Sequence, residues 1–99
     1  MFLSPRQTQA TRVDITAYGL WQMKLGTKSL SFEFDGVTLK DLIGALAEVK
    51  GVNLDETLAP NGRLAEGLKA FVNGVLTDDI GTRLRKGDEI VLSSVFDGG

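Results

Sequence analysis

The sequence ends in two glycines, Gly98 and Gly99, whose type and position point most directly to chemistry. Glycine lacks a Cβ atom and reaches backbone conformations closed to other residues, so a terminal pair can pass along a narrow channel. Such a thread presents one reactive group, the α-carboxylate of Gly99. We expect this carboxylate to react, and Gly98 to provide slimness and flexibility. A frayed end without function is the alternative interpretation of the dipeptide alone.

Chemistry elsewhere in the sequence is restricted by the residue types that it lacks. The chain has no cysteine and no histidine, which excludes thiol nucleophiles, disulfides, imidazole acid–base catalysis and the usual zinc ligands. It also has neither a P-loop nor a GxGxxG motif. Asp78 and Asp79 are neighbouring carboxylates, but their loop context predicts solvated charges rather than a catalytic pair. We therefore expect no enzyme, and no metal or cofactor bound by the chain itself.

The composition also excludes several classes of partner. A chain of 99 residues is one domain with a modest core. Its net charge of −2 provides no general attraction for nucleic acid or an anionic membrane. No apolar run approaches the ~20 residues of a transmembrane helix, and residues 1–3 are too short for the apolar core of a signal peptide. We expect a cytoplasmic protein that binds neither nucleic acid nor membrane.

The elements that must position the glycines follow from the apolar pattern. Apolar and polar residues alternate over residues 12–18 (RVDITAY) and 29–35 (SLSFEFD), which predicts two half-buried strands. Residues 25–28 have turn chemistry, so the two strands are expected to pair as a hairpin. Trp21 lies off the strand pattern, and packing is the favoured interpretation of its role.

The apolar period then changes to that of a helix over residues 37–51. Thr38 and Asp41 predict a capping box at its start, and Gly51 predicts its end. The apolar stripe that would face the sheet consists of Leu39, Leu42, Ile43, Leu46 and Val49. This segment is the main helix of the predicted fold.

The C-terminal half is expected to supply the remaining strands. After a long connection, residues 68–72 (LKAFV) are typical of a strand. Asn73 and Gly74 predict a tight turn that reverses the chain direction after this strand. A short strand is expected within residues 77–86, and residues 89–96 would form the final strand.

This order of elements predicts an α+β fold, a mixed four- to five-stranded sheet with one main helix packed across it. Residues 1–11 are mostly polar, contain a proline and lack periodicity, so they are expected to form a flexible leader. Residues 12–96 would form the folded domain, and residues 97–99 a flexible tail that carries the glycines.

Three segments together carry a family resemblance. The motifs FVNG at residues 71–74, LRKGDEIVL at residues 84–92 and the final Gly98-Gly99 resemble the sulfur-carrier branch of the ubiquitin-like β-grasp proteins. The similarity covers residues 12–99 and is most specific in the last part of the chain. It is strongest to the small subunit of molybdopterin synthase, of which the thiamine-pathway sulfur carrier is a shorter relative. That subunit usually has a proline-rich stretch where this sequence has residues 93–97 (SSVFD).

The resemblance implies a mechanism for Gly99. A free carboxylate is a poor electrophile, so a ubiquitin-activating-type adenylyltransferase would use Mg-ATP to adenylate Gly99, and sulfur would then convert it to a thiocarboxylate. The implied role is sulfur donation in molybdopterin (molybdenum or tungsten cofactor) synthesis, beside a larger synthase subunit. Three alternatives remain open: another sulfur acceptor such as the thiamine pathway, a protein modifier joined through Gly99 to lysines, and a β-grasp interaction module whose glycines are incidental.

The final strand is expected to border the surface that these partners bind. Both faces of the strand carry apolar residues, so one face can pack under the helix while the other leaves an apolar patch. We assign partner binding to Ile90, Leu92, Phe96 and Asp97, with Phe96 at the edge of the surface. Val91, Ser93 and Val95 share the opposite face.

Overall fold

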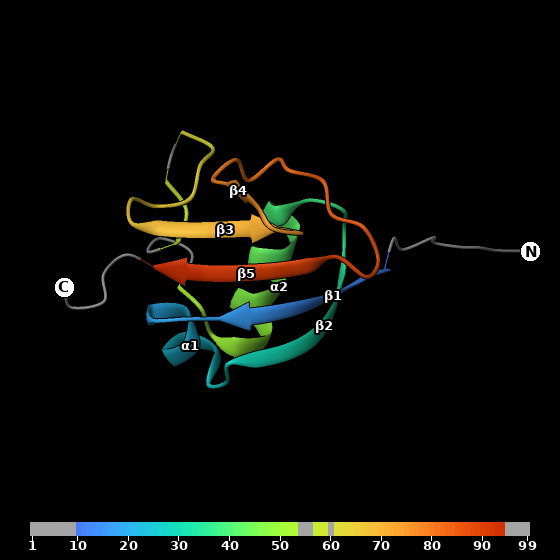
Figure 1. The fold of residues 1–99 in the computed structure, drawn as a ribbon, viewed down its shortest axis with the longest axis horizontal. Helices are drawn as coiled ribbons and strands as arrows, with labels where there is room; N and C mark the ends of the chain where they lie inside the picture. The colour runs from blue at the N-terminus through green and yellow to red at the C-terminus, as the bar shows by residue number, and fades with distance from the viewer. Residues whose placement is uncertain (1–9, 54–56, 60, 95–99) are drawn as a thin grey trace, which may run out of the picture.

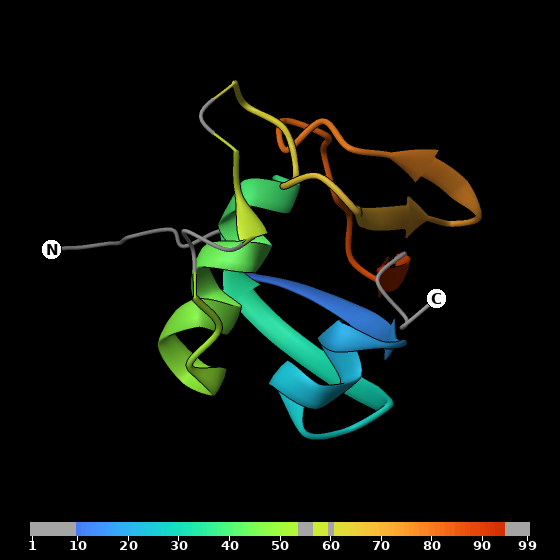
Figure 2. The same cartoon turned by 90° about the vertical axis from the view of Figure 1, so that its left-hand side faces the viewer.

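The computed structural model describes residues 10–53, 57–59 and 61–94, within which five strands form one sheet accompanied by two helices. The elements are β1 (Ala10–Ala17), α1 (Leu20–Leu25), β2 (Ser29–Asp35), α2 (Leu39–Lys50), β3 (Leu68–Val72), β4 (Val75–Thr77) and β5 (Glu89–Ser94). Figure 1 shows the strands side by side with α2 behind them, and Figure 2 shows α2 on one side of the sheet.

The sheet has the order β2-β1-β5-β3-β4, so β5 lies at its centre. β5 pairs in parallel with β1 and antiparallel with β3. The outer pairs, β1 with β2 and β3 with β4, are both antiparallel. The expected mixed sheet with one main helix packed across it is confirmed, with five strands rather than four.

Helix α2 begins and ends where the local signals predict. The hydroxyl of Thr38 accepts a hydrogen bond from the Asp41 N–H at 3.2 Å, and the Asp41 carboxylate accepts one from the Thr38 N–H at 3.1 Å. Gly51 ends the helix in the left-handed conformation, at φ 75°. The predicted stripe is confirmed for four of its five residues, whereas Val49 is 66% exposed. Helical geometry places Val49 at the margin of the stripe in the last turn, so it does not reach the core.

The capping box leads to a pH-dependent prediction. The Val37 N–H, which donates to Asp41 at 3.0 Å, is the main cause that holds the pKa of Asp41 below its usual value of 3.8. The folded pKa is lower than the unfolded pKa, so the stabilisation is complete above the usual value and is lost as pH falls through the folded value. We expect Asp41→Ala to lower the free energy of unfolding by about 1 kcal/mol at neutral pH and by progressively less in acid.

Urea denaturation at a series of pH values measures this effect. Glu48→Ala, which removes an exposed carboxylate from the same helix, is the matched control and should change the free energy of unfolding by less than about 0.5 kcal/mol. Equal losses for the two variants at neutral pH would show that the capping box does not stabilise the domain.

The connection between β1 and β2 differs from the expected hairpin turn. Helix α1 occupies most of it and buries Trp21 and Leu25, which are 1% and 4% exposed. Packing of Trp21 is therefore confirmed, but the turn is limited to the residues after Gly26, which ends α1 at φ 76°. Six residues are too few for a helix to be stable on its own, so α1 depends on the burial of these side chains.

Two predicted boundaries are wrong. β1 begins at Ala10, two residues before the strand that was predicted at residues 12–18. Thr11 is buried and pairs with Phe34 of β2, and its hydroxyl donates to the Gly36 carbonyl at 2.6 Å. β4 lies at Val75–Thr77 rather than within residues 77–86, because the turn returns the chain directly onto β3. Residues 1–9 and the predicted tail lie outside the described residues.

The core lies between α2 and the sheet. Its buried apolar side chains come from every element except β4 and from the connections: Val13, Ile15, Ala17, Trp21, Leu25, Phe32, Phe34, Leu39, Leu42, Ile43, Leu46, Val52, Leu64, Leu68, Ala70, Leu84, Ile90 and Leu92. Among the described residues, no helix is long and apolar enough to span a membrane. In the same part of the chain, no group of three or more acidic side chains could hold a metal ion.

Candidate functional site

The glycines are preceded by the central strand of the sheet. Gly98, Gly99, Phe96 and Asp97 lie outside the described residues, but the strand that leads to them is described as far as Ser94. Ser94 still pairs with Leu68 of β3, so β5 remains in the sheet up to this point. A central strand is bonded on both sides, which fixes its position more firmly than that of an edge strand.

The assignment of Ile90 and Leu92 to partner binding is wrong. They are 1% and 0% exposed and belong to the core under α2. Leu92 pairs with Ala17 of β1 and Ala70 of β3, which are also buried, so this whole row of the sheet faces the helix. Alternation along β5 separates its two faces but does not say which one α2 covers.

The opposite face of the sheet carries an apolar row beside β5. Val91 pairs with Phe71 of β3, which pairs in turn with Leu76 of β4. Val91 and Phe71 are half-buried, and Leu76 is 54% exposed. We refer to Val91, Phe71 and Leu76 as the apolar row. Because alternate residues of a strand point to opposite faces, this row faces away from α2 and is open to a partner.

Polar and basic side chains border the apolar row at the end where β5 stops. Tyr18 follows β1 and is 44% exposed, and the Lys28 Nζ lies 5.2 Å from the centroid of its ring in a cation–π contact. Lys69 of β3 pairs with Ser93 of β5. An apolar centre with a polar, charged rim is the composition of a protein–protein interface. Sequence reasoning assigned no role to Tyr18, although its place on the polar side of the β1 alternation was a signal.

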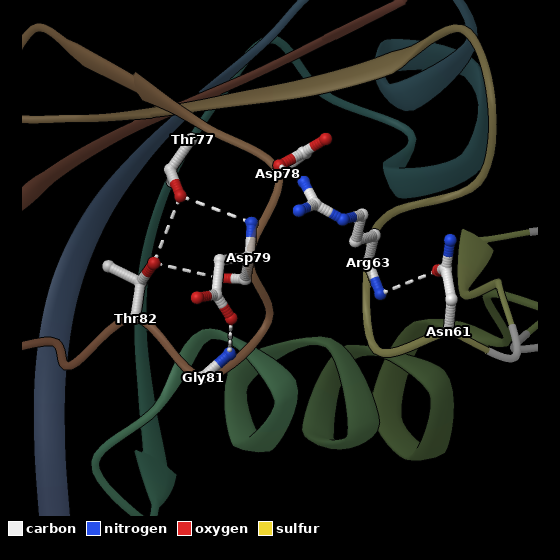
Figure 3. Close-up of polar contacts among 7 residues, drawn as sticks. All are labelled: Asn61, Arg63, Thr77, Asp78, Asp79, Gly81 and Thr82. Carbon is white, nitrogen blue, oxygen red and sulfur yellow. Dashed lines mark hydrogen bonds and ion pairs between the residues drawn. The ribbon is translucent and has the colours of Figure 1, made fainter.

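Asp78 and Asp79 are each engaged in a separate local contact, as Figure 3 shows. Asp78 forms an ion pair with Arg63 at 2.7 Å, and both side chains are more than half exposed. Asp79 accepts a hydrogen bond from the Gly81 N–H at 2.8 Å. The ion pair joins two connections, whereas the Asp79–Gly81 bond lies within one of them. The carboxylates do not converge on a shared position where they could act as a catalytic pair.

We compared the sequence and the fold with those of known proteins. No protein-family model matches the sequence, and no curated protein matches it. Among solved structures, the small archaeal modifier protein SAMP1 from Haloferax volcanii is 20% identical with a TM-score of 0.71, over 89% of this chain and 99% of that one. A putative molybdopterin converting factor, subunit 1, from Pyrococcus furiosus is 17% identical with a TM-score of 0.67, over 85% and 97%. The fold is the ubiquitin-like β-grasp.

A further match is the BexX/CysO complex from Amycolatopsis orientalis, one chain of which is 16% identical with a TM-score of 0.70, over 88% of this chain and 99% of that one. At these identities the likeness concerns the fold, and the β-grasp expected from the sequence is confirmed. In this β-grasp domain, the site consists of the apolar row, its polar rim and the end of β5. The apolar row and its rim have the composition of a partner-binding surface, and the predicted reactive residues Gly98 and Gly99 follow Ser94 in the sequence.

Proposed function

We propose that this protein is a sulfur carrier whose Gly99 α-carboxylate is adenylated by a partner enzyme and then converted to a thiocarboxylate. The observation that carries the proposal is that β5 ends beside the open apolar row, five residues before Gly99. Five extended residues span at most about 18 Å. An enzyme that binds the apolar row would therefore have the carboxylate within a short distance of its bound ATP.

The proposed chemistry needs nothing from this chain except the carboxylate. A carboxylate oxygen attacks the α-phosphorus of ATP and pyrophosphate leaves, which gives an acyl-adenylate with AMP as a good leaving group. The terminal sulfur of a donor's persulfide then attacks the acyl carbon and AMP leaves. Reduction of the sulfur–sulfur bond to the donor by a thiol leaves the thiocarboxylate on Gly99. Mg-ATP belongs to the adenylyltransferase, and the carrier holds sulfur without a cysteine.

The pathway that we propose is molybdopterin synthesis, with a larger synthase subunit as the acceptor. One structural neighbour is named as a subunit of a molybdopterin converting factor, and the sequence motifs resemble the same branch. The second candidate is a protein modifier joined through Gly99 to lysine amines, which the neighbours named as modifier proteins favour. Both functions begin with the same activation step.

Intact-mass spectrometry of the natively expressed protein tests the proposal. We expect a species in which sulfur replaces one oxygen of the chain, and we expect fragmentation to place it at Gly99. A variant with one residue appended after Gly99 is the control and should lack this species. Isopeptide adducts in which the C-terminal residues of this chain are joined to lysines of other proteins would favour the modifier. An unmodified carboxylate after incubation with adenylyltransferase, ATP and a persulfide donor would contradict the sulfur-carrier function, and the absence of ATP–pyrophosphate exchange would contradict both functions.

Reconstitution separates the possible acceptors. The thiocarboxylated protein is combined with a molybdopterin synthase large subunit and the cyclic pyranopterin precursor, and the dithiolene product is measured. Product formation supports the molybdopterin pathway. A stable thiocarboxylate without dithiolene would assign the carrier to another sulfur-transfer pathway, such as that of thiamine.

A further inference from the structure

The end of β5 is held against the start of α1. The Tyr18 N–H donates a hydrogen bond to the Leu92 carbonyl at 2.9 Å. Two residues further along each segment, the Leu20 N–H donates to Oγ of Ser94 at 3.4 Å. Figure 1 shows α1 beside the end of the sheet at which β5 stops. Ser94 therefore has β3 on one side, through its pairing with Leu68, and α1 on the other.

Gly19 allows this close approach. Its backbone lies at φ 60° and ψ −129°, a conformation that side-chain-bearing residues rarely adopt. A Cβ atom at this position would lie 2.9 Å from Oγ of Ser94, which is closer than real Cβ contacts. A residue larger than glycine would therefore push the hydroxyl away.

The hydroxyl of Ser94 also accepts a hydrogen bond from the first turn of α1. The first N–H groups of a helix have no partner within the helix and usually bond to the side chain of the residue that precedes it. Here that residue is Gly19, which has no side chain, and the oxygen comes instead from Ser94, 74 residues after Leu20. At 3.4 Å this bond is long, so it acts together with the Tyr18–Leu92 bond and the packing on Gly19.

We infer that Ser94 is a positioning residue, whose contact with Gly19 and Leu20 sets the point at which the chain leaves the sheet and hence the reach of the Gly99 carboxylate. The inference rests on the proposed function. From Ser94, the carboxylate can lie at most about 18 Å away, and release of the strand back to Leu92 would add about 7 Å. A longer tether lowers the effective concentration of the carboxylate at the active site of a docked enzyme.

The experiment compares Ser94→Ala with Ser93→Ala in the full chain. Both substitutions remove one hydroxyl from β5, but Ser93 lies on the opposite face and pairs with Lys69. In the isolated protein, we expect hydrogen exchange at the Leu20 amide to be about fivefold faster in Ser94→Ala only. We also expect the order parameter of the residue 94 amide to fall in this variant from the value of about 0.85 of rigid backbone.

The functional measurement is ATP–pyrophosphate exchange with the adenylyltransferase. We expect kcat/KM to fall at least about twofold for Ser94→Ala. It should stay unchanged for Ser31→Ala, which removes an exposed hydroxyl from β2, outside the apolar row and its rim. Thermal melting should stay near that of the unmodified chain for both variants. Gly19→Ala, which displaces the Ser94 hydroxyl without removing it, should also accelerate exchange at Leu20.

The outcomes separate this inference from the proposed function. Equal Leu20 exchange in Ser94→Ala and Ser93→Ala would overturn the contact, and faster exchange with unchanged kcat/KM would overturn the positioning role. If the unmodified chain supports no pyrophosphate exchange, the proposed function fails. The Leu20 exchange rate and the residue 94 order parameter then decide whether Ser94 holds the strand end, because both are measured on the isolated protein.

Discussion

Deleting Gly99 is expected to abolish activation by the adenylyltransferase while the domain stays folded. The deletion moves the terminal carboxylate back by one residue, about 3.5 Å along an extended chain. A displacement of about 1 Å in an active site can cost a hundredfold in rate, so a loss of at least about 100-fold in ATP–pyrophosphate exchange is expected. Gly99 has no side chain that could pack in the core, so the melting temperature should not change.

A chain with one residue appended after Gly99 provides the complementary variant. It keeps both glycines but places the carboxylate one residue further from the folded domain. We expect a similar loss of ATP–pyrophosphate exchange. The circular dichroism spectrum and melting curve of each variant serve as the folding control. Pyrophosphate exchange at the unmodified rate by the truncated chain would contradict the proposal that Gly99 is the reactive residue.

Leu92→Ala is expected to have the largest effect on stability. Leu92 is 0% exposed in the centre of the sheet, and truncation of such a leucine leaves a cavity that packing cannot fill. We expect the free energy of unfolding to fall by about 3 kcal/mol, and the melting temperature to fall by roughly 12–24 °C for a domain of this size. Urea denaturation and thermal melting measure the two quantities.

Val91→Ala on the neighbouring residue is the matched variant for the open face. Val91 is half-buried in the apolar row, so we expect it to lower the free energy of unfolding by less than about 1.5 kcal/mol and to weaken binding of the adenylyltransferase by about fivefold. Titration calorimetry measures the binding. If Val91→Ala binds the enzyme as tightly as the unmodified chain, the apolar row is not the docking surface.

The elements with strong local signals could be predicted from the sequence. The capping box of Thr38 and Asp41 and the glycine at residue 51 depend only on neighbours a few residues away, so both ends of α2 were predicted correctly. The turn at Asn73 and Gly74 is equally local, because both residues adopt positive φ, at 52° and 86°. The β-grasp order followed from these elements together with the alternation of β1 and β2.

Elements that depend on burial against distant residues could not be predicted in this way. Helix α1 is too short to form from its own propensity, and it exists because Trp21 and Leu25 enter the core. The first residues of β1 belong to the sheet because Thr11 pairs with Phe34 and bonds to Gly36, more than 20 residues away. Neither contact leaves a signal in the local sequence.

For the candidate site, the sequence supports a prediction about chemistry. The final glycines, the absence of cysteine and histidine, and the apolar alternation of residues 89–96 predict that the reactive group is a carboxylate that follows a strand with two apolar faces. The folded structure was needed to show that α2 covers Ile90 and Leu92 and leaves Val91 open, and that Ser94 contacts Gly19. Alternation along a strand defines two faces, but which face is buried depends on the elements that the folded chain packs against it.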